Sequence, residues 1–393
     1  MTNSEKFKSR PLLLMTAGAK GAVASTIAVA VSAMRKAPEA ILPSLITRNS
    51  FPYLGPPQAM YVAGWDTQTA ELTRCINNHG VLPENLWEPH RTEIEDIVIN
   101  QAPSLDQSLL DQIEHLMKDI RTFRDKHPNA RPVLINLLPA NVQMNLDRYE
   151  NLPHLLSERG PMAFPDLAYA LAAIRSGVPV VNFTPNHFEV PVIVREAAKQ
   201  NVPIAGYDGK TGQTYLKVVL ASALKARSFY VDGWYSLNIL GNTDGKNLMD
   251  PDRSAGKVAN KTDLLDDILG YPVGRQYNAP SHKVRIDYYP PRGDAKEAWD
   301  VIDFQGMFGL PMSIRLNFQG RDSILATPMV LDLARWMVVL KMTGRSGAIP
   351  ELAFYFKKPL GENPPLSFQD QLYRLRELEA ECDQKISRSR SEE

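Results

Sequence analysis

Short apolar runs alternate with stretches of helical periodicity through the first half of the chain. Runs of this kind, bounded by glycine, proline and polar residues, are typical of buried strands. The predicted strands are 11–16, 61–66, 132–141, 179–183 and one that begins at Pro203. The predicted helices are 27–34, the long periodic stretch 71–127, and 164–176. Strands that alternate with helices predict an α/β fold with a mostly parallel, doubly wound sheet.

Two polar loops follow this region, at 206–214 and at 238–245. Each contains an aspartate, amide or hydroxyl side chains, and glycines that allow close backbone approach, a composition that suits a polar ligand. Ordinary turns have the same composition, so both interpretations stay open at this point. The helix between the loops is expected to bury one face, formed by Leu216, Val219, Leu220 and Leu224.

Further elements are predicted in the last third of the chain. Residues 283–289 and 313–317 alternate as strands do, and an apolar helix covers 329–341, with Ser323 or Asp322 as its N-cap. A charged amphipathic helix is expected around 367–383, followed by a disordered tail at 386–393.

Composition narrows the class of protein. The 393 residues suggest about two domains, and 44 basic residues balance 44 acidic ones, so no global field draws the chain to nucleic acid or an anionic membrane. Cys75 and Cys382 stand far apart, which argues for a reducing compartment and against a thiolate zinc site. Lys20 and glycines interrupt the first apolar stretch, unlike a signal peptide, and no later stretch reaches about 18 uninterrupted apolar residues. We therefore expect a cytoplasmic protein.

The first strand leads into a glycine turn that reads GxxGxxA, with Gly18 and Gly21 as its glycines. A strand, a glycine turn and a helix can seat a dinucleotide diphosphate at the helix N-terminus, although a plain tight turn fits the same residues. Asp66, Asn141 and Asn182 all fall at predicted carboxyl ends of strands, where ligands of doubly wound sheets bind. This agreement favours dinucleotide binding.

Taken together, the loops resemble the motifs of the myo-inositol-1-phosphate synthase family, also called inositol-3-phosphate synthase. The family's GDD-x-KSGQT loop is similar to 206–214, its N-x-x-GNNDG-x-NL loop to 238–248, and its K-E-I-S-K segment to 257–261. Its GDSK is similar to 293–296, its EDSLLATP to 321–328, and its LKAPL to 356–360. Six matches in the same order are far more specific than one.

Two motifs depart from the family. The glycine-rich turn, close to GGNNGST in the family, is reduced to residues 21–26, so that Ala22 and Val23 stand in place of two asparagines. The family's NGSPQN appears as residues 182–187, with Phe183 in place of the glycine. These departures leave open how the diphosphate is held and whether the substrate is the family's own.

The resemblance implies a redox-neutral cyclisation of D-glucose 6-phosphate to 1D-myo-inositol 3-phosphate with tightly bound NAD+: oxidation at C5, enolisation, intramolecular aldol addition and reduction. The intermediates are anionic, so ammonium groups in a closed site should stabilise them. The resemblance assigns this work to Lys257, Lys296 and Lys357, and phosphate contact or proton donation to Lys261. A lysine crowded by cations has a lowered pKa, which suits proton transfer.

The other site residues are also assigned through the resemblance. Asp208, Asp244 and Asp322 lie near the nicotinamide and bracket the lysines, Asp294 orients Lys296, and Asn238 and Asn242 bind sugar hydroxyls. The expected cofactor-binding residues are Gly18, Gly21, Ser25, Asp66, Ala140, Asn141, Asp208, Thr211, Asp244, Asp322 and Ser323. The acidic loops suit a monovalent or divalent cation, but the histidines show no metal-ligand spacing.

The resemblance further implies a Rossmann-type NAD-binding domain at 10–200, an inserted α+β catalytic and oligomerisation domain at 201–325, a return to the first domain at 326–385, and a homotetramer. Three alternatives remain open: a cyclase of a different sugar phosphate, a simple NAD-dependent sugar-phosphate dehydrogenase, and a non-catalytic nucleotide-binding protein.

Overall fold

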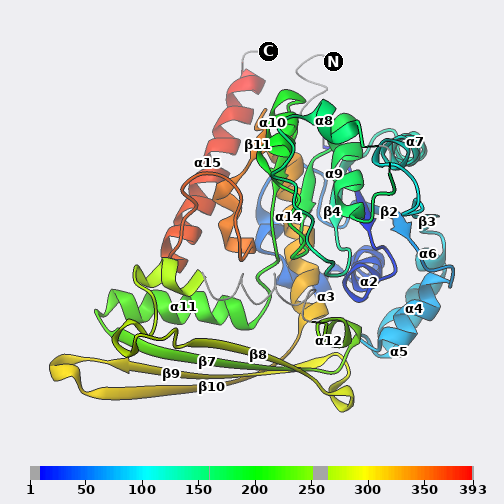
Figure 1. The fold of residues 1–393 in the computed structure, drawn as a ribbon. Helices are drawn as coiled ribbons and strands as arrows, with labels where there is room; N and C mark the ends of the chain where they lie inside the picture. Colours follow the sequence, from blue (N-terminus) through cyan, green and yellow to red (C-terminus); the bar gives the residue numbers. More distant parts are fainter. Residues whose placement is uncertain (1–8, 159, 251–263, 392–393) are drawn as a thin grey trace.

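A seven-stranded sheet forms the centre of the computed structural model, which describes residues 9–158, 160–250 and 264–391. In spatial order its strands are β11 (Gly347–Ala348), β6 (Pro203–Ala205), β5 (Val180–Asn182), β4 (Arg131–Asn136), β1 (Leu12–Ala17), β2 (Met60–Asp66) and β3 (Val98–Gln101). Neighbouring strands all run parallel. The predicted doubly wound α/β fold is therefore confirmed (Figure 1).

Helices surround this sheet and connect its strands (Figure 1). Those before β6 are α2 (Ala22–Lys36), α3 (Pro38–Ile41), α4 (Leu72–His79), α5 (Glu84–Trp87), α6 (Arg91–Glu95), α7 (Leu109–Lys126), α8 (Leu152–Leu156), α9 (Pro165–Arg175) and α10 (Pro191–Lys199). Those after β6 are α11 (Gln213–Ala226), α12 (Thr243–Asn247), α14 (Asp322–Met342) and α15 (Phe368–Ser391), and residues 264–269 are helical. Short 3₁₀ turns are η1 (Leu42–Ser44), η2 (Ile46–Asn49), η3 (Glu88–His90), η4 (Arg275–Tyr277), η5 (Pro290–Arg292), η6 (Met307–Gly309) and η7 (Pro350–Tyr355).

Strand β1 explains why both faces of this sheet are covered. Leu12 and Leu14 join one apolar cluster with residues of α2 and α14, whereas Leu13 and Met15 join another with residues of α7 and α9. Successive side chains of a strand point to opposite faces, so the two clusters lie on opposite sides of the sheet. An uninterrupted apolar run is what a strand buried on both faces requires.

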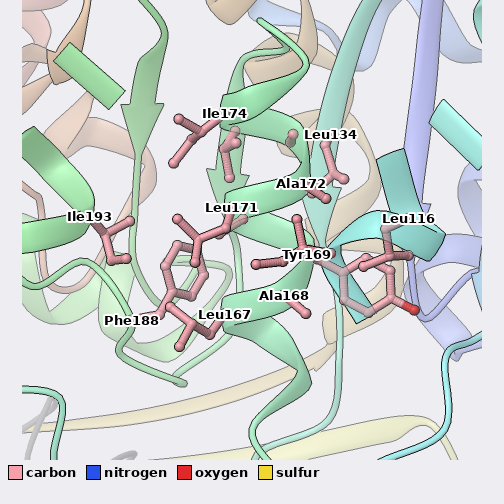
Figure 2. Close-up of a cluster of buried hydrophobic side chains, with 14 of the residues drawn as sticks. Leu116, Leu134, Leu167, Ala168, Tyr169, Leu171, Ala172, Ile174, Phe188 and Ile193 are labelled. Carbon is pink, nitrogen blue, oxygen red and sulfur yellow. The ribbon is translucent and has the colours of Figure 1, made fainter. Parts of the chain in front are cut away.

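Helix α9 is buried along almost its whole length, from Asp166 to Ile174. Figure 2 shows its leucines and Ile174 packed toward Phe188 and Ile193, while Tyr169 reaches toward Leu116 of α7. Alanines occupy much of the remaining surface and let neighbouring elements approach closely. A helix that is apolar all round is expected in such an interior position.

Helix α14 is long and apolar enough, by length and composition, to cross a membrane, but 78% of the relevant window is buried inside the fold. It packs against α2 and against β4, β5 and β6 of the first sheet. Asp332 and Arg335, both buried, hold the segment 46–55 against it: Asp332 accepts from the backbone N–H and hydroxyl of Thr47, and Arg335 donates to Gly55 O and Ser50 O. We therefore interpret α14 as a core helix of this fold.

A second sheet of four strands lies beside the first (Figure 1), in the order β10 (Pro311–Arg321), β9 (Ala295–Gln305), β7 (Tyr230–Leu240) and β8 (His282–Tyr288). β7 runs parallel to β8, and its pairing with β9 is antiparallel, as is that of β9 with β10. One face packs against α11 and residues 264–269 through Val218, Trp234, Leu265 and Ile302. The opposite face carries Tyr235 and Trp299, which are exposed.

The predicted apolar face of α11 is confirmed only at Leu224, which is buried. Leu216, Val219 and Leu220 are only partly buried, whereas Gln213, Lys217, Val218, Ala221 and Ser222 are buried. The reason is a buried polar network beneath the helix, in which Gln213 Nε2 donates to Asp300 and Lys217 Nζ donates to Ser236 Oγ. Hydrogen bonding makes a polar face suitable for burial.

Several predicted boundaries also change. The stretch 71–127 is interrupted by β3, and the strand predicted at 132–141 ends at Asn136, whose side-chain oxygen accepts from Leu138 N in the following turn. Helix α2 begins at Ala22 rather than Ile27, because Gly21 already acts as its N-cap. Strand β9 was not predicted from the sequence at all.

Two further predictions fail in the last third of the chain. Neither Asp322 nor Ser323 is the N-cap of α14, since the helix already begins at Asp322 and Arg321 occupies the cap position. The tail predicted to be disordered is helical as far as Ser391. Leu375, Leu378, Cys382 and Ile386 are buried at helical spacing, so the apolar stripe that holds α15 continues beyond residue 383.

Candidate active site

The loops that follow β1, β2, β4, β5 and β6 lie together, because carboxyl ends of parallel strands share one edge of a sheet. The second sheet meets this edge. Asn247, at the end of α12, donates to Ala140 O, and Arg321, at the end of β10, donates to Val81 O. The candidate site therefore lies between the two sheets.

The glycine turn after β1 has the geometry of a cradle. Gly18 has a φ of +80°, and a side chain there would place its Cβ 3.0 Å from Leu137 O. Gly21 is the N-cap of α2, and no side chain caps the first N–H groups of this helix. Ser25, predicted to contact the cofactor, donates its hydroxyl to Ala22 O instead, 3.1 Å away. The N–H groups of residues 18–21 already donate within the protein, so the donors left for a ligand are the first N–H groups of α2.

Asp66, at the end of β2, is buried and both of its carboxylate oxygens accept backbone hydrogen bonds. Oδ2 accepts from Lys20 N and Oδ1 from Gln68 N, each at 2.8 Å. The carboxylate thus fixes the glycine turn against the β2 loop, with lone pairs left for ribose hydroxyls. Turn, helix N-terminus and acidic residue together fit the ribose and diphosphate of a dinucleotide.

Ala140 and Asn141 lie in the loop after β4. Asn141 N donates to Asn186 Oδ1 at 2.8 Å, and Asn186 Nδ2 donates to Pro139 O at 2.9 Å. Ala140 packs with Leu240, at the end of β7, and with Leu248, just after α12. Asn186 therefore holds this loop in place, and Ala140 forms part of the contact with the second sheet.

Asp208 and Lys357 form a buried ion pair. Lys357 Nζ donates to Asp208 Oδ1 at 2.6 Å, and the two side chains are 7% and 4% exposed. The backbones pair as well: Lys357 N donates to Asp208 O, Lys210 N to Tyr355 O and Tyr207 N to Lys358 O. A short antiparallel ladder thus joins the polar loop after β6 to the segment after η7.

A second pair lies close by, because the same loop supplies Thr211. Thr211 Oγ1 donates to Asp322 Oδ1, and Lys296 Nζ donates to Asp322 Oδ2, both at 3.1 Å. The Lys296 side chain is 9% exposed. The structure therefore brings Lys296, Lys357, Asp208, Thr211 and Asp322 together from four separate segments.

Asp294 does not pair with Lys296 as predicted, since the lysine donates to Asp322 instead. Asp294 Oδ1 instead lies 3.4 Å from Ser323 Oγ and 3.5 Å from Asn242 Nδ2. Burial is the main cause that raises the pKa of the Asp294 carboxyl. Asp294 is thus placed beside Ser323 and Asn242 rather than as the partner of a lysine.

The remaining predicted residues are less informative. Asn238 is fully buried on the inner face of β7. Asp244 lies in α12, and its side chain is outside the described part of the structure, as are Lys257 and Lys261 entirely. Among the described residues no group of three or more His, Cys, Asp or Glu side chains could hold a metal ion.

Sequence reasoning missed Lys210, which lies inside the first polar loop. It is fully buried, and its Nζ donates to Gln371 Oε1 at 2.6 Å and to Ala353 O at 3.1 Å. Burial lowers the pKa of its ammonium to about 7. Lys210 ties the loop of Asp208 to α15 and to the segment before Lys357, and its place between two glycines of the motif could have drawn notice.

A second missed group surrounds Asp166, where α9 begins. Its Oδ1 accepts from Asn136 Nδ2 at 2.6 Å and from Asn186 Nδ2 at 2.9 Å. Burial raises the pKa of Asp166 to about 6 and that of Glu189, fully buried nearby, to about 8. These groups support the loops after β4 and β5 from beneath, and nothing in the local sequence pattern indicates this.

Comparisons with known proteins agree with the motifs. Residues 212–323 match the family model described as myo-inositol-1-phosphate synthase. Inositol-3-phosphate synthase 1 of Bacteroides thetaiotaomicron is 39% identical over 259 residues, which cover 64% of this chain and 60% of the relative. Inositol-3-phosphate synthase 1 of Oryza sativa subsp. japonica is 31% identical over 306 residues, which cover 70% and 59%. The chain thus spans about 60% of the length of these curated relatives.

Solved structures share the fold over nearly the whole chain. Inositol-3-phosphate synthase of Caenorhabditis elegans gives a TM-score of 0.83 at 22% identity, covering 96% of this chain and 86% of that one. A myo-inositol-1-phosphate synthase-related protein of Thermotoga maritima gives 0.77 at 21% identity, covering 95% and 98%. The resemblance inferred from the motifs is confirmed in sequence and in fold.

Proposed function

We propose that this chain, a relative of the myo-inositol-1-phosphate synthases, converts D-glucose 6-phosphate to 1D-myo-inositol 3-phosphate with bound NAD+. The observation that carries the proposal is the convergence of two lysine–aspartate pairs beside a dinucleotide cradle: Lys357–Asp208, which is buried, and Lys296–Asp322, in which the aspartate side chain is 30% exposed. Such a site offers fixed ammonium groups to developing negative charge.

NAD+ held in this cradle would supply the hydride acceptor for oxidation at C5 and the hydride for the final reduction, so that the reaction would have no net redox change. A ketone at C5 acidifies the C6 proton, and both the enolate and the aldol alkoxide that follow are anions. Lys296 and Lys357 are the described lysines that stabilise these oxygens, since fixed charges need no reorganisation. Asp322 and Asp208 hold the ammonium groups in position.

Other residues have supporting roles in this proposal. The backbone of Gly18 and Gly21, with Asp66, binds the ribose and diphosphate, while Ala140, Asn141, Thr211, Asp322 and Ser323 line the path toward the nicotinamide. Asn242 and Asn238 bind sugar hydroxyls, and Asp294 positions Asn242 and Ser323. Lys257 and Lys261 lie outside the described residues. In this proposal Lys257 stabilises the anionic intermediates with Lys296 and Lys357, and Lys261 contacts the phosphate or donates a proton, as the motif implies.

The decisive experiment is incubation of the purified protein with glucose 6-phosphate. We expect loss of reducing sugar, formation of periodate-releasable phosphate and no accumulation of NADH. Stoichiometric NADH would instead identify a dehydrogenase. Turnover of another hexose or pentose phosphate from a panel, with none of glucose 6-phosphate, would identify a cyclase of different specificity.

We also propose a homotetramer in the cytoplasm, assembled through the second sheet. The outer face of this sheet exposes Tyr235 and Trp299, at 44% and 51%, beside the partly exposed Leu237, Ile239 and Val301. Exposed apolar side chains, here on the same face as Lys283, Arg285 and Arg315, mark a surface that an assembled protein can cover. In this proposal 10–200 and 326–385 form the NAD-binding domain, and 201–325 form the catalytic and assembly domain.

A further inference from the structure

Lys20 lies in the middle of the glycine turn and is fixed there at three points. Its N–H donates to Asp66 Oδ2 at 2.8 Å, its carbonyl oxygen lies 2.8 Å from His79 Nε2, and its Nζ donates to Gln68 O at 2.7 Å. The lysine side chain therefore extends from the turn after β1 to the loop after β2. These two loops flank the place where the ribose of a dinucleotide lies.

The Lys20 ammonium is nearly buried, with 9% of the residue exposed. The hydrogen-bond acceptor that the structure gives it is the neutral carbonyl of Gln68, while the Asp66 carboxylate accepts the N–H groups of Lys20 and Gln68. An ammonium has three N–H donors, and burying it against a neutral group alone is costly. An anionic ligand in the cradle would supply the acceptors and the countercharge.

The rest of the turn lacks polar side chains. Ala22 and Val23 occupy the first helical positions, where the family motif carries two asparagines. The hydroxyl of Ser25 donates to Ala22 O. Backbone N–H groups remain at the N-terminus of α2, but they carry no full charge. Lys20 is the cationic side chain that the turn itself provides.

We propose that the Lys20 ammonium binds the ribose–diphosphate part of the dinucleotide and replaces the polar contacts that Ala22 and Val23 lack. The inference rests on the proposed function, because it concerns the same cofactor. It assigns to this chain a way of holding the dinucleotide that depends on a charge, and hence on ionic strength.

The test compares Lys20→Met and Lys20→Gln with the unaltered protein, measuring the Kd of NAD+, ADP-ribose and adenosine by calorimetry on the dinucleotide-free protein. Gln at position 20 can still donate to Gln68 O, so it separates loss of charge from loss of the structural contact. Lys36→Met is the matched control: it removes a positive charge from the far end of the same helix, where Lys36 pairs with Glu93 at the surface.

We expect both Lys20 variants to raise the Kd of NAD+ and the Kd of ADP-ribose by the same factor, roughly 10- to 100-fold, as for loss of a charge-assisted hydrogen bond. Adenosine binding and the Kd values of Lys36→Met should not change, and the penalty should shrink as salt is raised. Unchanged NAD+ affinity in Lys20→Gln would overturn the inference and leave the proposed function standing. If the unaltered protein itself binds no NAD+, both fail.

Discussion

At the scale of single residues, the pair Lys357–Asp208 combines two roles. Both side chains are almost fully buried, so each neutralises a charge that the interior would otherwise not tolerate. The same geometry holds the ammonium group in one place before any substrate arrives, which is what electrostatic stabilisation of an oxyanion needs. In the proposed function, structure and catalysis therefore both depend on this one contact.

We predict that Lys357→Ala lowers kcat by about 10²- to 10³-fold while bound NAD+ is retained. It should also lower the free energy of unfolding by about 3–5 kcal/mol, because the buried Asp208 carboxylate loses the ammonium group that pairs with it. Steady-state kinetics, cofactor release on denaturation and chemical unfolding measure the three quantities. Lys199→Ala, at an exposed position, is the control, and loss of NAD+ from Lys357→Ala would contradict the assigned role.

Glu189 gives a prediction for pH. Burial raises the pKa of its carboxyl from 4.5 to about 8, so the folded protein holds a proton there that the unfolded chain loses above pH 4.5. This contribution to stability is complete below pH 4.5 and is lost as the pH rises toward 8, by at most about 1.4 kcal/mol per pH unit. Glu189→Gln removes the titration.

Unfolding by guanidinium at several pH values between 4.5 and 8 tests this prediction. We expect Glu189→Gln to gain stability relative to the unaltered protein steadily across this range. A difference that does not vary with pH would mean that Glu189 is already ionised in the folded protein.

At the scale of elements, the loop after β6 fits against the end of β5 through one glycine. A Cβ on Gly209 would lie 2.2 Å from Cζ of Phe183, the residue that replaces a glycine of the family motif. The Phe183 ring also lies edge-on to Phe356, just before Lys357. Gly209 thus lets the loop of Asp208 and the segment of Lys357 pack closely around one aromatic ring.

We expect Gly209→Ala to destabilise the protein by about 1–3 kcal/mol, as overpacking does. Phe183→Ala opens space at the ring, so Gly209→Ala should destabilise the Phe183→Ala variant much less than the unaltered protein. The double-mutant cycle should therefore give a clear coupling energy. Gly160→Ala is the control, because a Cβ there meets no atom within 4 Å. Additive effects of the two changes would refute direct packing between Gly209 and Phe183.

The same scale shows which elements local sequence can predict. The bounds of β1 and α9 were predicted closely, since a continuous apolar run indicates an element that is buried on all sides. β9 was missed because its inward positions include Lys296 and Asp300, which interrupt the apolar alternation. Likewise, Asp322 rather than Asp294 pairs with Lys296 because the β9–β10 register sets Lys296 opposite Gly320, and such long-range register leaves no local pattern.

At the scale of the whole molecule, the two faces of the second sheet have different expected roles. The inner face carries Asn238, Lys296 and the network of Asp300, whereas the outer face exposes Tyr235 and Trp299. Association through the outer face would fix the strands that position Lys296. Assembly and catalysis are thus expected to be coupled.

We predict that Trp299→Glu dissociates the tetramer and reduces turnover, because a charge on the outer face opposes burial of that surface. Light scattering and sedimentation measure the mass, with activity measured at the same concentrations. Leu86→Glu, on α5 and also 50% exposed, serves as the control. A tetramer that persists in Trp299→Glu would exclude the sheet face as the interface.

The ladder between the loop of Asp208 and the segment of Lys357 has a consequence for synthesis of the chain. The two partners are 149 residues apart, so a ribosome adding about 5–20 residues per second makes the carboxylate roughly 7–30 s before its ammonium. During that interval the nascent loop lacks Lys357 and the segment that carries it. Helix α14, which covers one face of the first sheet, is also made late, so the contact between the two segments is completed only near the end of synthesis.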